Sequence, residues 1–273
     1  VLNVPITLNV DQLLVEEPNW EKLNSIFSEL EFRRIYDRIK IVFNNTLNDL
    51  TNASNRSSSQ LSLFQIDENE QAKIISNAVK LTNHKSITET VKKLIIEPQI
   101  GFMFYTRNNN LLGMAFSCKS NQYYLLFNNN LIPQSVLVLL EPLFEDEKIE
   151  KIYLNAKSIF KVLLQNKINF CDNFFDIHLA DYLINSENNL SFSNIVQRYN
   201  IDIINIDLLD MNSDQGLLCY LIETSKSLIE IHRQQELLLK KNNLTSLFLD
   251  VEKPLVKVLL NMERNGIFID TLA

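Results

Sequence analysis

Apolar and polar positions change their spacing along the chain, which predicts where helices and strands lie. Residues 101–106, 111–118 and 123–127 form three short strand-like runs. Asparagine triplets at 108–110 and 128–130 lie between or after these runs, where Asn suits turns. Closely spaced runs joined by short polar turns indicate an antiparallel meander of three strands.

Helical spacing of apolar residues surrounds this meander. The predicted helices span residues 19–31, 86–96, 131–143, 156–164, 176–184, 191–199, 216–241 and 251–265. Further short strands are predicted at 61–66, 151–154 and 174–175. Ser86 and Glu89 have the spacing of a capping box at the start of their helix. A meander followed by an α-β-α succession and more helices predicts an α/β fold with a mixed sheet flanked by helices, and this order fits the ribonuclease H-like architecture.

The chain is predicted to have three parts. Residues 51–60 are small and polar without periodicity, which is typical of a linker. We therefore expect a helical N-terminal connection over 1–60, the α/β domain over 61–241 and a further helical segment over 242–273. The chain opens on Val1 instead of Met, and we expect it to be a piece of a longer protein.

Composition and charge limit the function. The chain is 46% hydrophobic, which suffices for one sizeable core. Its net charge of −7 argues against strong nucleic-acid binding, because such binding depends on neutralising phosphates. Cys118, Cys171 and Cys219 are odd in number and widely spaced, so we expect buried free thiols and a cytoplasmic location.

Four segments, in order along the chain, resemble bacterial DNA polymerase I (family A). Residues 30–34 (LEFRR) resemble the segment between its 5′ nuclease and exonuclease domains. Residues 143–157 resemble the approach to the second exonuclease motif, and residues 175–186 the helix that follows it. Residues 247–270 resemble the start of the polymerase domain, with its helix, Gly terminator and Asp at fixed offsets. The resemblance implies a 3′–5′ exonuclease-like domain at 61–241 and the start of a polymerase domain at 242–273.

The family's exonuclease reaction requires two divalent metal ions held by carboxylates. The first motif of the family is Asp-x-Glu on a strand, where residues i and i+2 share a face. The matching positions here are Tyr105 and Arg107. A guanidinium stays protonated in a protein and repels cations, so this pair is not expected to bind metal.

The second and third motifs of the family are also altered. In the second, Asn155 and Lys157 are retained, but Ile159 replaces the Asp. In the third, Tyr220 is retained, and either Thr224 or Glu223 corresponds to the Asp. The resemblance thus implies an inactive exonuclease-like domain that acts as a structural spacer, with no metal or cofactor of its own. The longer protein would be a Mg²⁺-dependent DNA polymerase acting in replication and repair. The fragment would be a monomer without a membrane contact, and its partners would be the polymerase and 5′ nuclease domains of the same protein and, through the polymerase, DNA.

Two alternatives remain open at the level of sequence. Shifted carboxylates, such as Asp176, Asp181 or Glu223, would support an active metal-dependent exonuclease. However, Asp176 is expected to cap a helix and Asp181 to lie on a solvated face. Alternatively, Tyr105 and Arg107 would bind single-stranded DNA weakly, by stacking on a base and contacting a phosphate.

Overall fold

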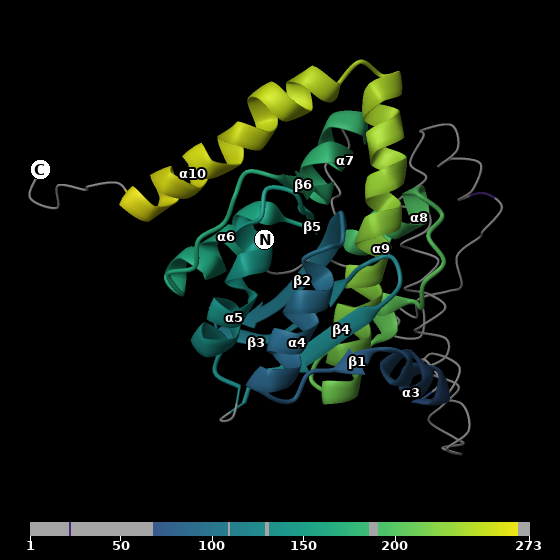
Figure 1. The fold of residues 1–273 in the computed structure, drawn as a ribbon. Helices are drawn as coiled ribbons and strands as arrows, with labels where there is room; N and C mark the ends of the chain where they lie inside the picture. Colours follow the sequence, from purple (N-terminus) through teal and green to yellow (C-terminus); the bar gives the residue numbers. More distant parts are fainter. Residues whose placement is uncertain (1–21, 23–67, 109, 129–130, 186–190, 267–273) are drawn as a thin grey trace, which may run out of the picture. The chain divides into compact units, whose positions relative to one another are not determined.

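The computed structural model describes Lys22 and residues 68–108, 110–128, 131–185 and 191–266. The 68–266 part forms a mixed six-stranded sheet with helices on both faces (Figure 1). The fold class predicted from the sequence is confirmed in this part.

Several predictions fall outside the described residues. These are the helical connection and linker over 1–60 (Lys22 apart), the strand at 61–66 and the end of the 247–270 motif. The proposed domain boundaries, at residues 60 and 241, stay predictions.

The three predicted meander strands occupy the middle and one side of the sheet. β2 (Gln99–Arg107) pairs antiparallel with β3 (Asn110–Ser117), which pairs antiparallel with β4 (Gln122–Leu126). β5 (Glu150–Tyr153) runs parallel to β2 on its other side. A two-residue strand that the sequence did not indicate, β1 (Val79–Lys80), runs parallel to β4.

The sheet ends at β6 (Phe174–Asp176), which is parallel to β5. The strand order is β1-β4-β3-β2-β5-β6, so β2 is an interior strand with partners on both sides. Residues at the carboxyl end of β2 and in the turn after β5 therefore lie at the same edge of the sheet.

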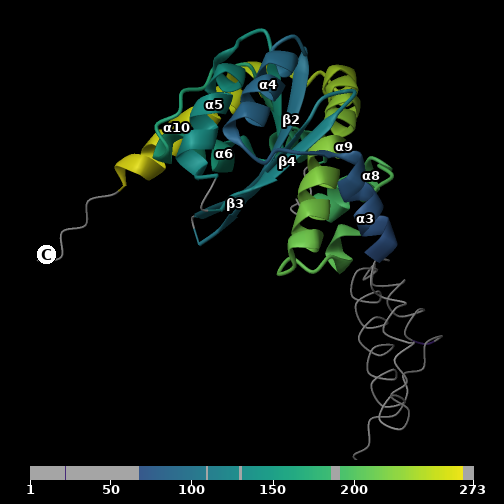
Figure 2. The same ribbon diagram turned by 60° about the horizontal axis from the view of Figure 1, so that its bottom comes forward.

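Two layers of helices bury the two faces of the sheet. One layer contains α4 (His84–Leu94), α5 (Pro133–Glu145), α6 (Ala156–Gln165) and α10 (Lys253–Asn265). The other contains α3 (Glu68–Asn77), α7 (Ile177–Asn185), α8 (Phe192–Arg198), α9 (Asp214–Lys241) and the π-helical turn η4 (Leu247–Glu252). Figure 2 shows α3 lying alongside α9. We call the two cores the α5-side cluster and the α9-side cluster.

The start of α4 differs from the capping prediction. Asn83 is the N-cap, and its side chain accepts a hydrogen bond of 2.9 Å from the backbone N–H of Ser86. Ser86 stands at the third helical position and completes the capping box by accepting from the Asn83 N–H. The helix therefore begins at His84, two residues before Ser86, because Asn is an equally good N-cap.

Alternation along β2 divides its side chains between the two cores. Ile100, Phe102 and Phe104 belong to the α5-side cluster. Met103 belongs to the α9-side cluster, and Tyr105 packs against it. On the α9 side, Gly101 brings the strand close to the long helix, because an added Cβ would lie 2.6 Å from the Ser225 carbonyl oxygen.

This close approach gives a stability prediction. We expect Gly101→Ala to lower the free energy of unfolding by about 1–3 kcal/mol, because the new methyl group forces α9 away from the sheet. Thr106→Ala, at an exposed position of the same strand, should cost about 0.5 kcal/mol or less. Urea unfolding followed by circular dichroism measures both, and equal values for the two variants would contradict this packing argument.

The three cysteines are free, but they are not equally buried. Cys118 and Cys219 are buried, as expected. Cys171 is only half-buried, which corrects the prediction for that residue, because it lies in the loop before β6 instead of in a core strand or helix. No helix in the described part of the chain is long and apolar enough to cross a membrane.

Candidate functional site

Tyr105 and Arg107 lie at the carboxyl end of β2, on the side of the sheet covered by α9. Tyr105 is half-buried against the α9-side cluster. Arg107 is exposed, and its Nη2 donates a 2.7 Å hydrogen bond to Oδ1 of Asn212, just before α9 begins. The pairing register between β2 and β3 shifts between Tyr105 and Thr106, which marks a β-bulge. Bulges occur often beside functional sites because they redirect side chains.

Tyr220 projects from the first turns of α9 toward the same strand end. Burial raises the pKa of the Tyr220 phenol, and the neighbouring Tyr105 and Asp207 add to the effect. Thr224 stands one helical turn later and therefore on the same side of α9. Thr224 is fully buried, and its Oγ1 has no hydrogen-bond partner among the described residues.

The Glu223 side chain leaves α9 in a different direction from that of Tyr220. Its carboxylate lies 3.9 Å from Nζ of Lys226. Burial raises the Glu223 pKa; Lys226 opposes the effect, while the negative charges of Asp202 and Glu70 add to it. Since Glu70 belongs to α3, Glu223 lies on the α3 side of the helix, whereas Tyr220 lies beside Tyr105.

The second motif forms the start of α6. The Asn155 side chain is the N-cap and accepts a 3.1 Å hydrogen bond from the Ser158 N–H. Nζ of Lys157 donates a 2.8 Å hydrogen bond to Oε1 of Glu263 on α10. Ile159 is buried in the α5-side cluster. The two retained polar residues of the motif therefore have structural partners, and Ile159 is a core residue.

Asp176 is a fixed structural carboxylate at the end of β6. Its Oδ2 accepts 2.7 Å from the Ala156 N–H at the start of α6, and its Oδ1 accepts 3.0 Å from the Leu179 N–H in α7. Burial raises the pKa of Asp176 to about 6, although the backbone N–H groups act in the opposite direction. One buried side chain thus caps α7 and orients α6, which agrees with the capping role expected from the sequence.

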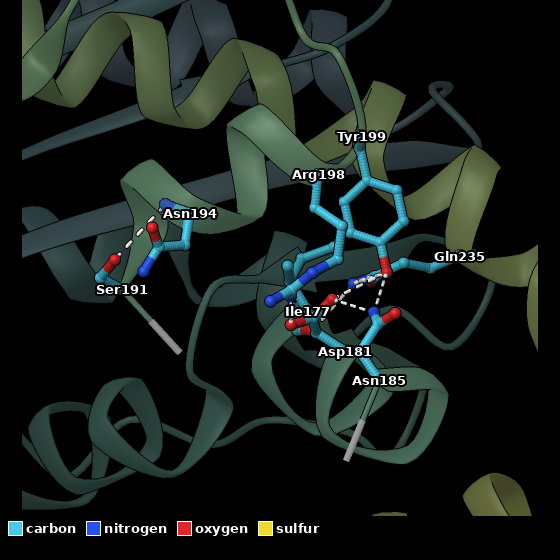
Figure 3. A network of polar contacts seen from close by, with 8 residues as sticks. All are labelled: Ile177, Asp181, Asn185, Ser191, Asn194, Arg198, Tyr199 and Gln235. Atoms are coloured by element: carbon cyan, nitrogen blue, oxygen red, sulfur yellow. Dashed lines mark hydrogen bonds and ion pairs between the residues drawn. The ribbon is translucent and has the colours of Figure 1, made fainter. Parts of the chain in front are cut away.

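Asp181 is buried, which corrects the expectation that it lies on a solvated face. Figure 3 shows it inside a polar network that joins three helices. It forms an ion pair with Arg198 and accepts hydrogen bonds of 2.8 Å from the Tyr199 hydroxyl and from Nδ2 of Asn185. Gln235 of α9 donates to the Tyr199 oxygen at 3.3 Å. The Asp181 carboxylate can be buried because each of its oxygens has a hydrogen-bond or ion-pair partner.

The side chains at the matched positions do not fit a pair of divalent ions. Mg²⁺ and Mn²⁺ need several carboxylate oxygens. With Thr224 taken for the third motif, the four positions matched to metal ligands carry a phenol, a guanidinium, a buried sec-butyl group and a hydroxyl, contributed by Tyr105, Arg107, Ile159 and Thr224. Within the described ranges, no group of three or more His, Cys, Asp or Glu side chains is arranged to hold a metal ion.

Lys151 and Cys171 form a close pair of side chains away from the positions matched to metal ligands. Lys151 of β5 is almost fully buried, and its Nζ lies 2.8 Å from Sγ of Cys171. The sequence analysis missed the pair because the two residues are 20 positions apart and carry no motif spacing. The one sequence feature that could have indicated the pair is the isolated Lys151 within a predicted strand of otherwise apolar character.

Comparison with known proteins identifies the domain. Residues 104–209 match the family model described as the ribonuclease H-like domain of DNA polymerase I. DNA polymerase I from Borreliella burgdorferi is 25% identical over 223 residues, which are 74% of this chain and 24% of that protein. The chain thus spans about a quarter of the length of this curated relative.

Solved structures share the fold at low sequence identity. Escherichia coli RNase D, an exoribonuclease involved in structured RNA processing, matches with a TM-score of 0.56 and 12% identity over 70% of this chain and 52% of its own. The POL domain of Pol1 from M. smegmatis, in complex with DNA primer-template and dNTP, matches with a TM-score of 0.56 and 15% identity over 71% of this chain and 33% of its own. The family match, the curated relative and the fold agree: the chain contains a 3′–5′ exonuclease-like domain of the DNA polymerase I family.

Proposed function

We propose that this chain is the exonuclease-like part of a DNA polymerase I that acts in DNA replication and repair, and that the domain itself does not cut DNA. The observation that carries the proposal is the chemistry at the four matched metal positions. Tyr105, Arg107 and Ile159 are not carboxylates, and Arg107 adds a positive charge. The third motif supplies at most one carboxylate, Glu223, if that residue and not Thr224 corresponds to its Asp. Two-metal hydrolysis requires bound cations on both the attacking and the leaving oxygen, and these side chains would not retain them.

The carboxylates that survive nearby support the same proposal. Asp176 binds two backbone N–H groups, and Asp181 is paired with Arg198. Glu223 lies beside Lys226, on the α3 side of α9. Each has a structural partner in its own location, and a metal site made from them would require these contacts to break. The fold is shared with an exoribonuclease, but a shared fold does not carry an activity by itself.

The domain would act as a rigid spacer beside the polymerase. α10 packs on the domain through Val256 and Leu260, which are buried. Other positions of α10 expose apolar residues at helical spacing, namely Leu255, Val258, Leu259 and Met262, and Val251 of η4 just before the helix is exposed as well. An exposed apolar stripe of this kind is typical of a contact surface, and we propose that the polymerase part of the longer protein covers it.

The remaining properties are assigned to the longer protein. We propose a cytoplasmic enzyme that binds DNA and uses Mg²⁺ at a polymerase site beyond this chain, and we propose that the fragment itself is a monomer. The exonuclease-like domain would need neither metal nor cofactor. The acidic charge of −7 agrees with a domain that leaves DNA binding to its neighbours.

A metal-binding measurement tests the proposal. Titration of the chain with Mn²⁺, followed by calorimetry or electron paramagnetic resonance, should show no site of micromolar affinity. Asp176→Asn should leave the titration unchanged, because Asp176 binds backbone groups. Saturable binding of two Mn²⁺ ions that is lost in Asp176→Asn or Glu223→Gln would overturn the proposal.

A further inference from the structure

The Lys151–Cys171 pair joins two elements at the β6 edge of the sheet. Nζ of Lys151 donates hydrogen bonds to the carbonyl oxygens of Asp146 and Ile149 and a third, of 2.8 Å, to Sγ of Cys171. Lys151 is 1% exposed, so its amine is held in one place by three partners. No carboxylate of the described residues forms an ion pair with it. The sulfur is therefore the one side-chain partner of this amine.

The surroundings of Cys171 favour reaction at sulfur. Cys171 is half-buried, whereas Cys118 and Cys219 are buried, so among the three thiols Cys171 is the most accessible to a small reagent. The ammonium group of Lys253 also lies within electrostatic range of Cys171. The Tyr153 phenol is a second titratable group within electrostatic range of this thiol. Cationic neighbours and partial exposure are the surroundings in which thiols become nucleophilic and easily oxidised.

We propose that Lys151 and Cys171 form a reversible sulfur–nitrogen crosslink when the protein meets hydrogen peroxide. The sulfur attacks one peroxide oxygen, the O–O bond breaks, and a sulfenic acid and the first water result. The hydroxide released from the peroxide becomes this first water by taking a proton from the Lys151 ammonium, which frees the nitrogen lone pair. The neutral nitrogen then attacks the sulfur, the S–O bond breaks, and the hydroxyl group leaves as the second water with one more proton from the nitrogen. Overall, thiolate, ammonium and peroxide give the S–N linkage and two waters, with two electrons passing from sulfur to peroxide.

The geometry explains why nitrogen captures the sulfenic acid. Sulfenic acids condense with a nearby thiol or nitrogen nucleophile. No second cysteine of the chain pairs with Cys171, since all three are free. The Lys151 nitrogen is already in contact with the sulfur and needs no chain movement to reach it. The crosslink would fasten β5 to the loop before β6 and is independent of whether the domain cuts DNA.

Peptide mapping of the intact chain tests the proposal. After peroxide treatment, trypsin digestion without reductant should give peptide 149–157, uncut at Lys151, joined to peptide 168–198, which contains Cys171. The joined species should be lighter by two hydrogen atoms than the sum of its parts and should disappear with dithiothreitol. Cys171 should react with peroxide faster than Cys118 and Cys219 by on the order of tenfold.

Matched variants separate the crosslink from simple oxidation. Lys148→Met, at an exposed lysine of the same segment, should leave the crosslink unchanged. Lys151→Met should abolish it and leave a sulfenic acid that a dimedone-type probe captures. Lys151→Arg keeps a buried cation and serves if the Met variant does not fold. Recovery of Cys171 as sulfinic acid or as an intermolecular disulfide in the wild-type chain, with normal cleavage at Lys151, would overturn the proposal.

Discussion

Replacing Asp181 by alanine should lower the free energy of unfolding by about 3 kcal/mol or more. The substitution removes the carboxylate that forms an ion pair with the Arg198 guanidinium and the acceptor of the Tyr199 hydroxyl and of the Asn185 amide. Asp181 is 1% exposed and Arg198 is 22% exposed, so solvent screens the pair only in part. Chemical unfolding monitored by circular dichroism measures the loss.

Two further variants make this result specific. Glu236→Ala removes an exposed ion pair of 2.7 Å with Lys240 and should cost about 0.5 kcal/mol or less. Asp181→Asn keeps the shape and one acceptor oxygen but removes the charge, and should fall between the two. A loss below about 1 kcal/mol for Asp181→Ala would show that the network does not stabilise the fold. The carboxylate would then be open to another role, including a catalytic one.

The free energy of unfolding should also depend on pH through the titration of Asp176. Burial raises the folded-state pKa of Asp176 from 3.8 to about 6, so the folded chain favours the neutral carboxyl group. The contribution to stability is therefore fully present below pH 3.8 and is lost as pH rises through about 6. A difference of about two pKa units corresponds to about 3 kcal/mol.

The comparison with Asp176→Asn isolates this contribution from all other titrating groups. We expect the stability of the wild type relative to Asp176→Asn to fall by about 3 kcal/mol between pH 3.5 and pH 7. Glu263→Gln provides the control of opposite sign, because Lys157 lowers the pKa of this exposed carboxylate. The loss of stability caused by Glu263→Gln should be slightly larger at high pH than at low pH. A wild-type advantage over Asp176→Asn that stays constant or grows with pH would contradict the argument.

Local patterns predicted most of the elements because each has a short-range cause. The meander follows from three strand-like runs separated by asparagine turns, and β2 to β4 begin and end within about two residues of the prediction. The long helix α9 follows from continuous helical spacing and is capped by Ser213. Gly266, with a φ of 68°, ends α10 as expected, because glycine adopts this conformation without strain.

Long-range contacts explain what the sequence did not predict. Asp181 lies four residues after Ile177, on the buried side of α7, but only the position of Arg198 and Tyr199 in space makes a charge acceptable there. A capping prediction based on Ser86 missed Asn83 because both residues satisfy local rules. In the third motif, the sequence left Thr224 and Glu223 as alternatives for the position of the Asp. The position of α3 now separates the two faces, and the assignment of Thr224 to the third motif stays a prediction.

The most direct test of the central claim is a degradation assay with the purified chain. We predict that a 5′-labelled single-stranded oligonucleotide, incubated with the chain and Mg²⁺ or Mn²⁺, keeps its full length at every time point. An active DNA polymerase I exonuclease, assayed in parallel, should shorten the same substrate from its 3′ end. Metal-dependent shortening by this chain that is abolished in Asp176→Asn or Glu223→Gln would show that a rearranged carboxylate site cuts DNA, and the account of an inactive spacer would be wrong.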